Sequence, residues 1–459
     1  MKHFIYKSIV LLLTVSICCS CKPKITVPSP SKGNIDPTRY VAVGNSITSG
    51  YADGALSYNG QIVSYPNLIA GQLKLVGGGN FTQPLMPQGS IGCGTADSSG
   101  QIIFTAPFKL DYSTDCLGVN SLGPIPSAGS GDKNALLTSI SSQGPFNNMG
   151  VPGAKVITAL APGYGNPANG TGKYNPFFTR MAKDVTSSSM ISDAMLLNPT
   201  FFSLFLGNND VLLYATNGGA SDSITPPSGS AGVGFDGSIN AIVSTLTSGG
   251  AKGVIGNIPD ITALPYFTTV PWNGLTLRQG QADTLNGVVP FLGITYVFKA
   301  GANPFVIYDA SVNTPSHARV IQQGELVLLD VPLDQIKCHK MGTLIPIPNQ
   351  YVLTATEIQN IKTATSAYNA SIQSVAQAKG LAFVDVNAFL SQTQKGISYD
   401  GISLNAQFVT GGAFSLDGIH LNPIGNALLA NEFIKAINNT YSSSIPQVDA
   451  TKYRGILFP

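Results

Sequence analysis

A serine, a histidine and an aspartate stand in settings that suit nucleophilic catalysis. Ser46 follows the apolar run 40–43, and Asp417 and His420 lie three residues apart far downstream. A serine hydroxyl is a poor nucleophile at neutral pH and needs an adjacent base. Histidine suits that role, and a carboxylate can hold the imidazole in the correct tautomer. We therefore expect Ser46 to be a nucleophile, His420 its base and Asp417 the partner of that base.

Two further positions could supply fixed donors to the oxyanion that forms when a carbonyl is attacked. Asn209 follows the apolar run 201–206, and Gly153 follows another short apolar run. We expect the oxyanion to be bound by the N–H groups of Ser46 and Gly153 and by the side-chain amide of Asn209. Gly153 could equally serve a tight turn. Asn209 could cap a helix, but Asp210 is the better candidate for that role.

The segments that must position these residues indicate an α/β fold. Five short apolar runs are mostly continuous rather than alternating, which is typical of parallel strands buried on both faces. Helical patterns lie between and after them, which favours a parallel sheet with right-handed crossovers. Ligands of such sheets bind at the carboxyl ends of the strands. The expected strands are 40–43, a stretch around Val151, 201–206, 253–258 and 382–386, and the expected helices are 66–73, a helix that ends at Gly380, and a last one from Pro423.

Two long stretches, 51–147 and 266–348, do not fit this alternation. We interpret both as loop-rich or β-rich insertions in one domain that spans 37–459. Residues 1–20 read as a signal peptide and 21–36 as a tether rich in Pro, Ser and Lys.

Four short motifs surround the candidate residues: Gly44-Asn45-Ser46-Ile47, Asn148-Met149-Gly150-Val151-Pro152-Gly153, Gly207-Asn208-Asn209-Asp210 and Asp417-Gly418-Ile419-His420. In this order they resemble the motifs of the SGNH (GDSL) hydrolases. The resemblance implies a flavodoxin-like three-layer α/β/α sandwich with a central parallel sheet, and a Ser-His-Asp mechanism without metal or cofactor. It implies the same roles for the catalytic and oxyanion residues named above.

The sequence departs from the family pattern at two positions beside the nucleophile. Asn45 stands where Asp is usual, and Ile47 where Leu is usual. Neither change removes a reacting group, so we expect a small effect. The insertions are large for the family, so the resemblance does not predict the shape of the substrate pocket.

We expect the protein to cleave carboxylic esters through an acyl-serine intermediate. The substrate could be a small-molecule, lipid or acylated-glycan ester. Two alternatives remain: an acyltransferase that uses the same site, and a glycan-binding lipoprotein whose hydrolase site is vestigial. Charged residues make up 10% of the chain and the net charge is +2, without a Lys/Arg cluster, so nucleic acid is not an expected partner. We expect a monomer.

The N-terminus reads as an export signal. Lys2 and Lys7 precede a short apolar stretch that ends in small and thiol residues. Ser20-Cys21 resembles the end of a bacterial lipobox, which implies lipid on Cys21, with Cys19 as the alternative. Lys22-Pro23-Lys24 lacks the acidic residues expected of a surface-export signal. We therefore expect an anchor in the outer membrane, on the periplasmic side rather than at the cell surface.

Three cysteines remain in the expected mature chain: Cys93, Cys116 and Cys338. Disulfides persist in exported proteins. Cys93 and Cys116 flank one loop-like stretch, so we predict that they pair. The alternative is two buried free thiols. Cys338-His339 lacks the further ligands that a zinc site needs, and we interpret it as structural.

Overall fold

A five-stranded parallel sheet forms the centre of the molecule. The computed structural model describes residues 29–98, 101–221 and 223–459. The expected signal peptide, the first part of the tether and both candidate lipid-attachment sites, Cys21 and Cys19, lie outside them. The strand order is β15-β8-β7-β1-β6, and all neighbours are parallel. The strands are β1 (Tyr40–Gly44), β6 (Asn148–Gly150), β7 (Phe201–Phe205), β8 (Lys252–Gly256) and β15 (Ala382–Val384).

All five runs that were expected to be strands are therefore confirmed, and the expected α/β fold class is confirmed with them. Counted along the chain from the β6 edge, the strand order is 2-1-3-4-5, which is the flavodoxin-like order. β6, the strand that follows β1 in the sequence, lies on one side of β1, whereas the later strands β7, β8 and β15 lie on its other side. The switch point of the sheet is therefore at β1. Ligands of such sheets bind at that switch point, beyond the carboxyl ends of the strands.

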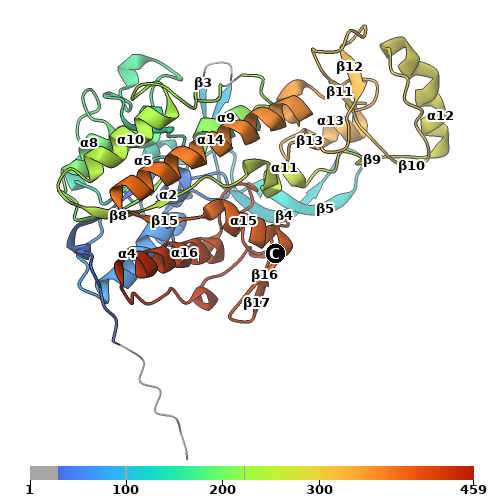
Figure 1. The fold of residues 1–459 in the computed structure, drawn as a ribbon. Coiled ribbons are helices and arrows are strands. Elements are labelled where there is room, and N and C mark those ends of the chain that lie inside the picture. Colours follow the sequence, from blue (N-terminus) through green and yellow to red (C-terminus); the bar gives the residue numbers. More distant parts are fainter. Residues whose placement is uncertain (1–28, 99–100, 222) are drawn as a thin grey trace, which may run out of the picture.

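Both faces of the sheet are covered, which explains why its strands are apolar without interruption. In β1, Tyr40 and Ala42 join one hydrophobic cluster, whereas Val41 and Val43 join another. The first cluster contains α4 (Tyr65–Lys74) and α16 (Pro423–Tyr441), and the second contains α8 (Met190–Met195), α10 (Phe235–Leu246) and α14 (Ala355–Lys379). Figure 1 shows these helices in two layers with the sheet between them.

The three expected helices form, with recognisable start and stop signals. At the start of α14, the N–H of Thr354 donates to the Glu357 carboxylate (2.8 Å), which is one half of a capping box. The helix ends at Gly380, whose φ of +61° is left-handed. α16 begins after Asn422, whose Oδ1 accepts from the N–H of Gly425 (3.0 Å). This asparagine cap fixes the direction in which the preceding loop, which carries Asp417 and His420, enters the helix.

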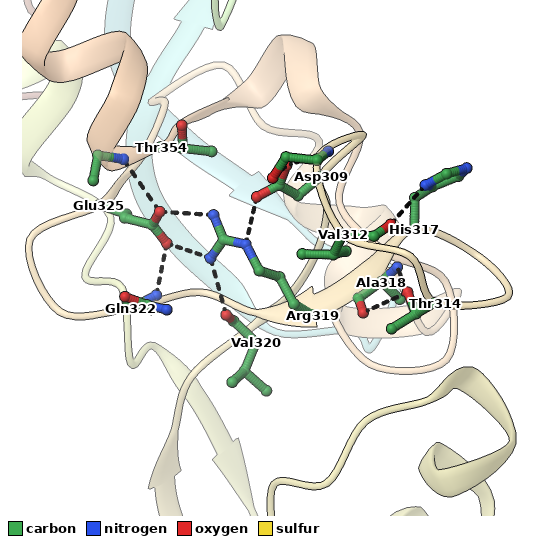
Figure 2. Close-up of polar contacts among 12 residues, drawn as sticks. Asp309, Val312, Thr314, His317, Ala318, Arg319, Val320, Gln322, Glu325 and Thr354 are labelled. Carbon is green, nitrogen blue, oxygen red and sulfur yellow. Dashed lines mark hydrogen bonds and ion pairs between the residues drawn. The ribbon is translucent and has the colours of Figure 1, made fainter.

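The stretch that follows β8 builds a small structure of its own beside the sheet. It has a separate hydrophobic cluster that includes Leu275, Phe305 and Val352. Figure 1 shows it to the right of the sheet, next to the start of α14. In Figure 2, Arg319 lies between Asp309 (2.6 Å) and Glu325 (2.7 Å). The other side of the Glu325 carboxylate accepts from the first N–H of α14 (3.2 Å), so this ion pair also joins the small structure to the core.

The disulfide joins Cys116 to Cys338, so the predicted Cys93–Cys116 pairing is wrong. Cys93 is a free, buried thiol. Its place beside Leu56, which it contacts through two backbone hydrogen bonds, keeps it in the core. Cys116 sits at the tip of the hairpin formed by β4 (Phe108–Thr114) and β5 (Asn120–Pro126), which reaches away from the sheet toward the end of α13 (Leu333–Cys338; Figure 1). The bond therefore ties the first of the two long stretches to the second.

The remaining elements are short and surround the sheet. No helix within the described ranges is long and apolar enough to cross a membrane. The other helices are α2 (Ser46–Ser49), α3 (Tyr58–Gln61), α5 (Lys133–Leu137), α6 (Val156–Ala159), α7 (Pro176–Met181), α9 (Asn209–Thr216), α11 (Pro265–Thr268), α12 (Gln279–Val288), α13 (Leu333–Cys338) and α15 (Val386–Lys395). The other strands are β2 (Gly94–Ser98), β3 (Gln101–Thr105), β4 (Phe108–Thr114), β5 (Asn120–Pro126), β9 (Leu275–Leu277), β10 (Gly301–Asn303), β11 (Val306–Tyr308), β12 (Ala318–Val320), β13 (Leu326–Val327), β14 (Val352–Leu353), β16 (Ile397–Tyr399) and β17 (Ile402–Leu404).

Candidate active site

Ser46 stands on a sharp turn from β1 into α2. The Asn45 carboxamide caps this helix by accepting from the N–H of Ile47 (3.2 Å). A Cβ atom on Gly44 would come within 1.9 Å of the Thr48 hydroxyl, so only glycine fits before the turn. Ser46 is the first residue of α2, and its N–H donates to no acceptor within the described residues. The turn thus presents a hydroxyl and an unused amide at the same point.

Ser46, His420 and Asp417 form a continuous hydrogen-bonded chain. His420 Nε2 lies 2.8 Å from Ser46 Oγ, and His420 Nδ1 lies 2.8 Å from Asp417 Oδ2. Ser46 and His420 are each more than nine-tenths buried. With the ring proton on Nδ1, Nε2 is free to accept the serine proton. The structure thus brings together the three residues that the sequence proposed as nucleophile, base and base partner, although they are up to 374 positions apart.

The Asp417 carboxylate is held by more donors than the imidazole alone. Oδ1 accepts from the N–H groups of Ile419 (2.9 Å) and His420 (2.8 Å) and from the Ser415 hydroxyl (3.0 Å). Oδ2 accepts from the N–H of Gly54 (2.9 Å) as well as from the ring. Burial alone would raise the pKa of Asp417, but the neighbouring imidazole and these donors hold it well below its usual range. The carboxylate therefore stays charged and fixed in direction.

The segment that follows α2 packs against these three hydrogen-bonded residues, and no sequence pattern predicted its role. The Tyr51 ring packs against the His420 imidazole with their centroids 4.8 Å apart, and the Tyr51 hydroxyl donates to the Gly54 carbonyl (2.6 Å). The Asp53 carboxylate accepts from the N–H of Leu416 (2.8 Å). Burial raises the pKa of Asp53 to about 6, although that hydrogen bond lowers it. No motif marks these residues, because their partners are more than 360 positions away.

Gly153 lies in a turn after β6 that glycine is needed to form. Its φ is +79°, in the left-handed region, and its N–H donates to no acceptor among the described residues. The Asn175 side chain donates to the carbonyl of Pro152 (2.7 Å) and so fixes the preceding peptide. The turn is therefore rigid, and its free amide is available to a ligand.

Asn209 and Asp210 both tie α9 to the Gly153 turn. The side-chain amide of Asn209 donates one hydrogen to the carbonyl of Ala154 (3.0 Å), which leaves its second hydrogen unused. The Asp210 carboxylate accepts from the N–H of Val156 (3.0 Å), at the start of α6. The expectation that Asp210 caps the helix of its own motif is therefore wrong: it lies inside α9 and binds the first amide of another helix. Burial raises the pKa of Asp210 to about 7.

A narrow, apolar pocket opens beside Ser46 and His420. Its cavity volume is about 60 Å³. This small volume suits a short acyl group. Its walls come from α15, α16 and the loop before α16, and include Phe389, Leu390, Phe414, Ile419, Leu428 and Leu429.

Comparisons with known proteins give only distant likenesses. No protein-family profile and no curated protein matches this sequence. Among solved structures, LAE5, an α/β hydrolase from the metagenome of Lake Arreo in Spain, has a TM-score of 0.35 at 12% identity, over 88% of this chain and 96% of its own. An extracellular lipase from Streptomyces rimosus has 0.31 at 12%, over 88% and 99%. A protein described as a GDSL-like lipase from Parabacteroides merdae has 0.30 at 10%, over 89% and 99%.

Proposed function

We propose that the protein is a serine ester hydrolase that cleaves short-chain carboxylic esters through an acyl-serine intermediate. The observation that carries the proposal is the hydrogen-bonded chain from Asp417 through His420 to Ser46, with both distances at 2.8 Å. The apolar pocket at the nucleophile supports an ester with a short apolar acyl group. Because all three residues and both hydrogen bonds between them are present, the arrangement also argues against a vestigial site.

In the proposed reaction, Ser46 Oγ attacks the ester carbonyl while its proton passes to His420 Nε2. The charged imidazole is stabilised by Asp417, which stays ionised throughout. The negative charge on the carbonyl oxygen is received by the amides of Ser46, Gly153 and Asn209. His420 then returns the proton to the leaving alcohol. Water, deprotonated by the same imidazole, releases the acid and restores the serine.

A fluorophosphonate probe and an ester assay together test this proposal. We expect stoichiometric labelling of wild-type protein and hydrolysis of p-nitrophenyl butyrate. Both should be lost in Ser46→Ala, since no other hydroxyl is paired with His420 Nε2 among the described residues. Ser49→Ala is a suitable control, because its hydroxyl is committed to the carbonyl of Ser46 (2.7 Å). Labelling and turnover that persist in Ser46→Ala would refute the proposal, and a wild-type protein that does neither would favour a binding role.

We further propose that the enzyme is lipid-anchored through Cys21, with Cys19 as the alternative position. The support is the sequence pattern alone. Growth of an expressing bacterium with an alkyne-tagged fatty acid should label the wild-type protein and not Cys21→Ala. If labelling is lost in Cys19→Ala but kept in Cys21→Ala, Cys19 is the attachment site. If wild-type protein is not labelled, the proposed anchor is excluded.

A further inference from the structure

A polar cavity separate from the pocket at Ser46 lies beyond the carboxyl ends of β8 and β15. Asn257 and Asp385, the first residues after these strands, both line it. Its volume is about 530 Å³, against about 60 Å³ for the apolar pocket, so it has room for a ring rather than a short chain. Its described lining contains none of the residues proposed for ester hydrolysis. The cavity is therefore a second place at which this edge of the sheet can hold a ligand.

Three carboxamides fix the backbone around this cavity. Asn369 on α14 binds both backbone groups of Ile258: its Oδ1 accepts from the N–H (2.8 Å), and its Nδ2 donates to the carbonyl (2.8 Å). Asn387 Nδ2 donates to the same carbonyl (3.1 Å). Asn257 Oδ1 accepts from the N–H of Asn387 (3.0 Å), and Asn257 Nδ2 donates to Asp385 Oδ1 (2.9 Å). The loop after β8, α14 and the start of α15 are thus joined into one frame, which preorganises the groups mounted on it.

Exposed polar groups on this frame have no partner in the described part of the protein. Asp385 Oδ1 accepts from Asn257 and from the N–H of Ala388 (3.0 Å), whereas Asp385 Oδ2 accepts no hydrogen bond from a described residue. The side chains of Ser366 and Gln373 likewise form no hydrogen bond with a described residue, and their spacing places them on the same face of α14. Asp385, Ser366 and Gln373 are all exposed and line the cavity, so a ligand can reach them.

The charges and an aromatic ring in the cavity indicate the class of ligand. Lys362 and Asp260 lie 3.9 Å apart and largely offset each other, which leaves Asp385 as the uncompensated charge and disfavours an anion. No group of His, Cys, Asp and Glu residues suited to a metal ion occurs in the ranges that the structure describes. Phe383 supplies an apolar ring beside the polar groups. A sugar matches this combination, because its hydroxyls both donate and accept hydrogen bonds and its ring carries an apolar C–H face.

We propose that this cavity binds one sugar unit of a glycan. Asp385 Oδ2 accepts a hydrogen bond from a sugar hydroxyl. Gln373 and Ser366 each offer a donor and an acceptor to further hydroxyls, and the ring of Phe383 packs against the C–H face of the sugar. The inference does not depend on the proposed ester hydrolysis, because it uses none of the same residues.

The polar cavity shares a wall with the apolar pocket of the candidate active site. In the loop after β8, Pro259 and Ile261 line the apolar pocket, whereas Asp260 between them lines the polar cavity. At the start of α15, Val386 lines the apolar pocket and Asn387 the polar cavity. A glycan bound in the cavity is therefore held next to the candidate active site.

A saturation-transfer NMR titration with the methyl glycosides of glucose, galactose, mannose, xylose and N-acetylglucosamine tests this inference. We expect wild-type protein to bind at least one of them with a Kd of about 1–10 mM, since a single ring makes few contacts. Ala370→Trp places a large side chain in the cavity and should abolish binding, because Ala370 is an exposed lining residue of α14. Ala378→Trp is the matched control: it is exposed on the same helix but lies outside the lining, and it should bind as wild-type protein does.

A second variant tests the chemistry of the cavity rather than its space. In Asp385→Asn the amide oxygen can keep both hydrogen bonds of Oδ1, and the NH₂ group takes the place of Oδ2. Because a charged acceptor becomes a donor, we expect the Kd to rise by about 10-fold or more. Thermal unfolding shows whether each variant is folded.

The outcomes separate this inference from the proposed function. If none of the sugars binds wild-type protein with a Kd below about 50 mM, the inference is wrong. If either Ala370→Trp or Asp385→Asn is folded and binds the sugar as wild-type protein does, the sugar lies elsewhere and the inference is again wrong. Fluorophosphonate labelling of Ser46 decides the proposed function separately, so each proposal can fail while the other stands.

Discussion

Replacement of Asp417 by Asn changes one oxygen into an NH₂ group and leaves the shape of the side chain almost unaltered. In the native protein Oδ1 accepts three hydrogen bonds and Oδ2 accepts two. The new NH₂ group opposes the fewest donors when it takes the Oδ2 position. There it faces His420 Nδ1, which can then be an acceptor only, so the ring proton moves to Nε2. In that tautomer Nε2 cannot accept the proton of Ser46.

We therefore expect kcat/KM of Asp417→Asn to fall by about 10⁴-fold, the loss associated with the wrong histidine tautomer in serine hydrolases, which corresponds to about 5.4 kcal/mol of transition-state stabilisation. The assay is hydrolysis of p-nitrophenyl butyrate, with thermal unfolding to show that the variant is folded. Asp53→Asn is the matched control, because its carboxylate bonds the backbone of Leu416 and not the ring. A folded Asp417→Asn variant that retains more than about one tenth of kcat/KM would refute this reasoning.

Three other perturbations test separate parts of the structure. The raised pKa of Asp53, about 6, means that the fold favours its protonated form, so the protein should lose stability as pH rises from about 4 through 6. Asp53→Asn should remove that loss. The Tm of this variant should exceed that of wild-type protein at pH 7.5 and approach it at pH 4. A difference in Tm between the two proteins that is the same at both pH values would contradict this. Gly153→Ala has room for its methyl group, since the nearest atom would be 3.6 Å away, but a φ of +79° strains alanine by about 1–2 kcal/mol. Its kcat should fall by up to about 10²-fold as the amide turns away, and a change in KM alone would contradict an oxyanion role. Peptide mapping without reduction should find Cys116 linked to Cys338, and Cys116→Ser should lower stability by about 2–5 kcal/mol, whereas Cys93→Ser should leave that linked peptide intact.

The central sheet was predictable because burial on both faces leaves a mark in the sequence. A strand such as β7, with Phe201 and Phe202 on opposite faces, reads as a continuous apolar run. The helices were predictable where their ends carry capping residues, as at Thr354 and Gly380. The order of the strands is not written in these local signals. It followed from the family resemblance.

The residues of the candidate site could be proposed one by one from the sequence, but the residues that support them could not. Ser46 and His420 could be recognised from their types and from the residues around them. Tyr51 and Gly54 could not, because a ring contact and a backbone N–H leave no signature in a sequence. The cysteine pairing failed for a related reason. Proximity along the chain favoured Cys93, whereas the fold brings the hairpin tip to a residue 222 positions away.

The register of three neighbouring strands brings the residues proposed as nucleophile and oxyanion donors to one edge of the sheet. Gly44, the last residue of β1, pairs with Gly150 of β6 on one side and with Phe205 of β7 on the other. The three strands thus end level with one another at the switch point of the sheet. Ser46, Gly153 and Asn209 follow these ends by two, three and four residues, respectively. Their place at the same edge is therefore set by the sheet itself, and a one-residue slip of any of these strands would shift one residue relative to the others. Asp417 and His420 have no strand to place them, which is why their loop depends on the Asn422 cap, on Gly54 and on Tyr51.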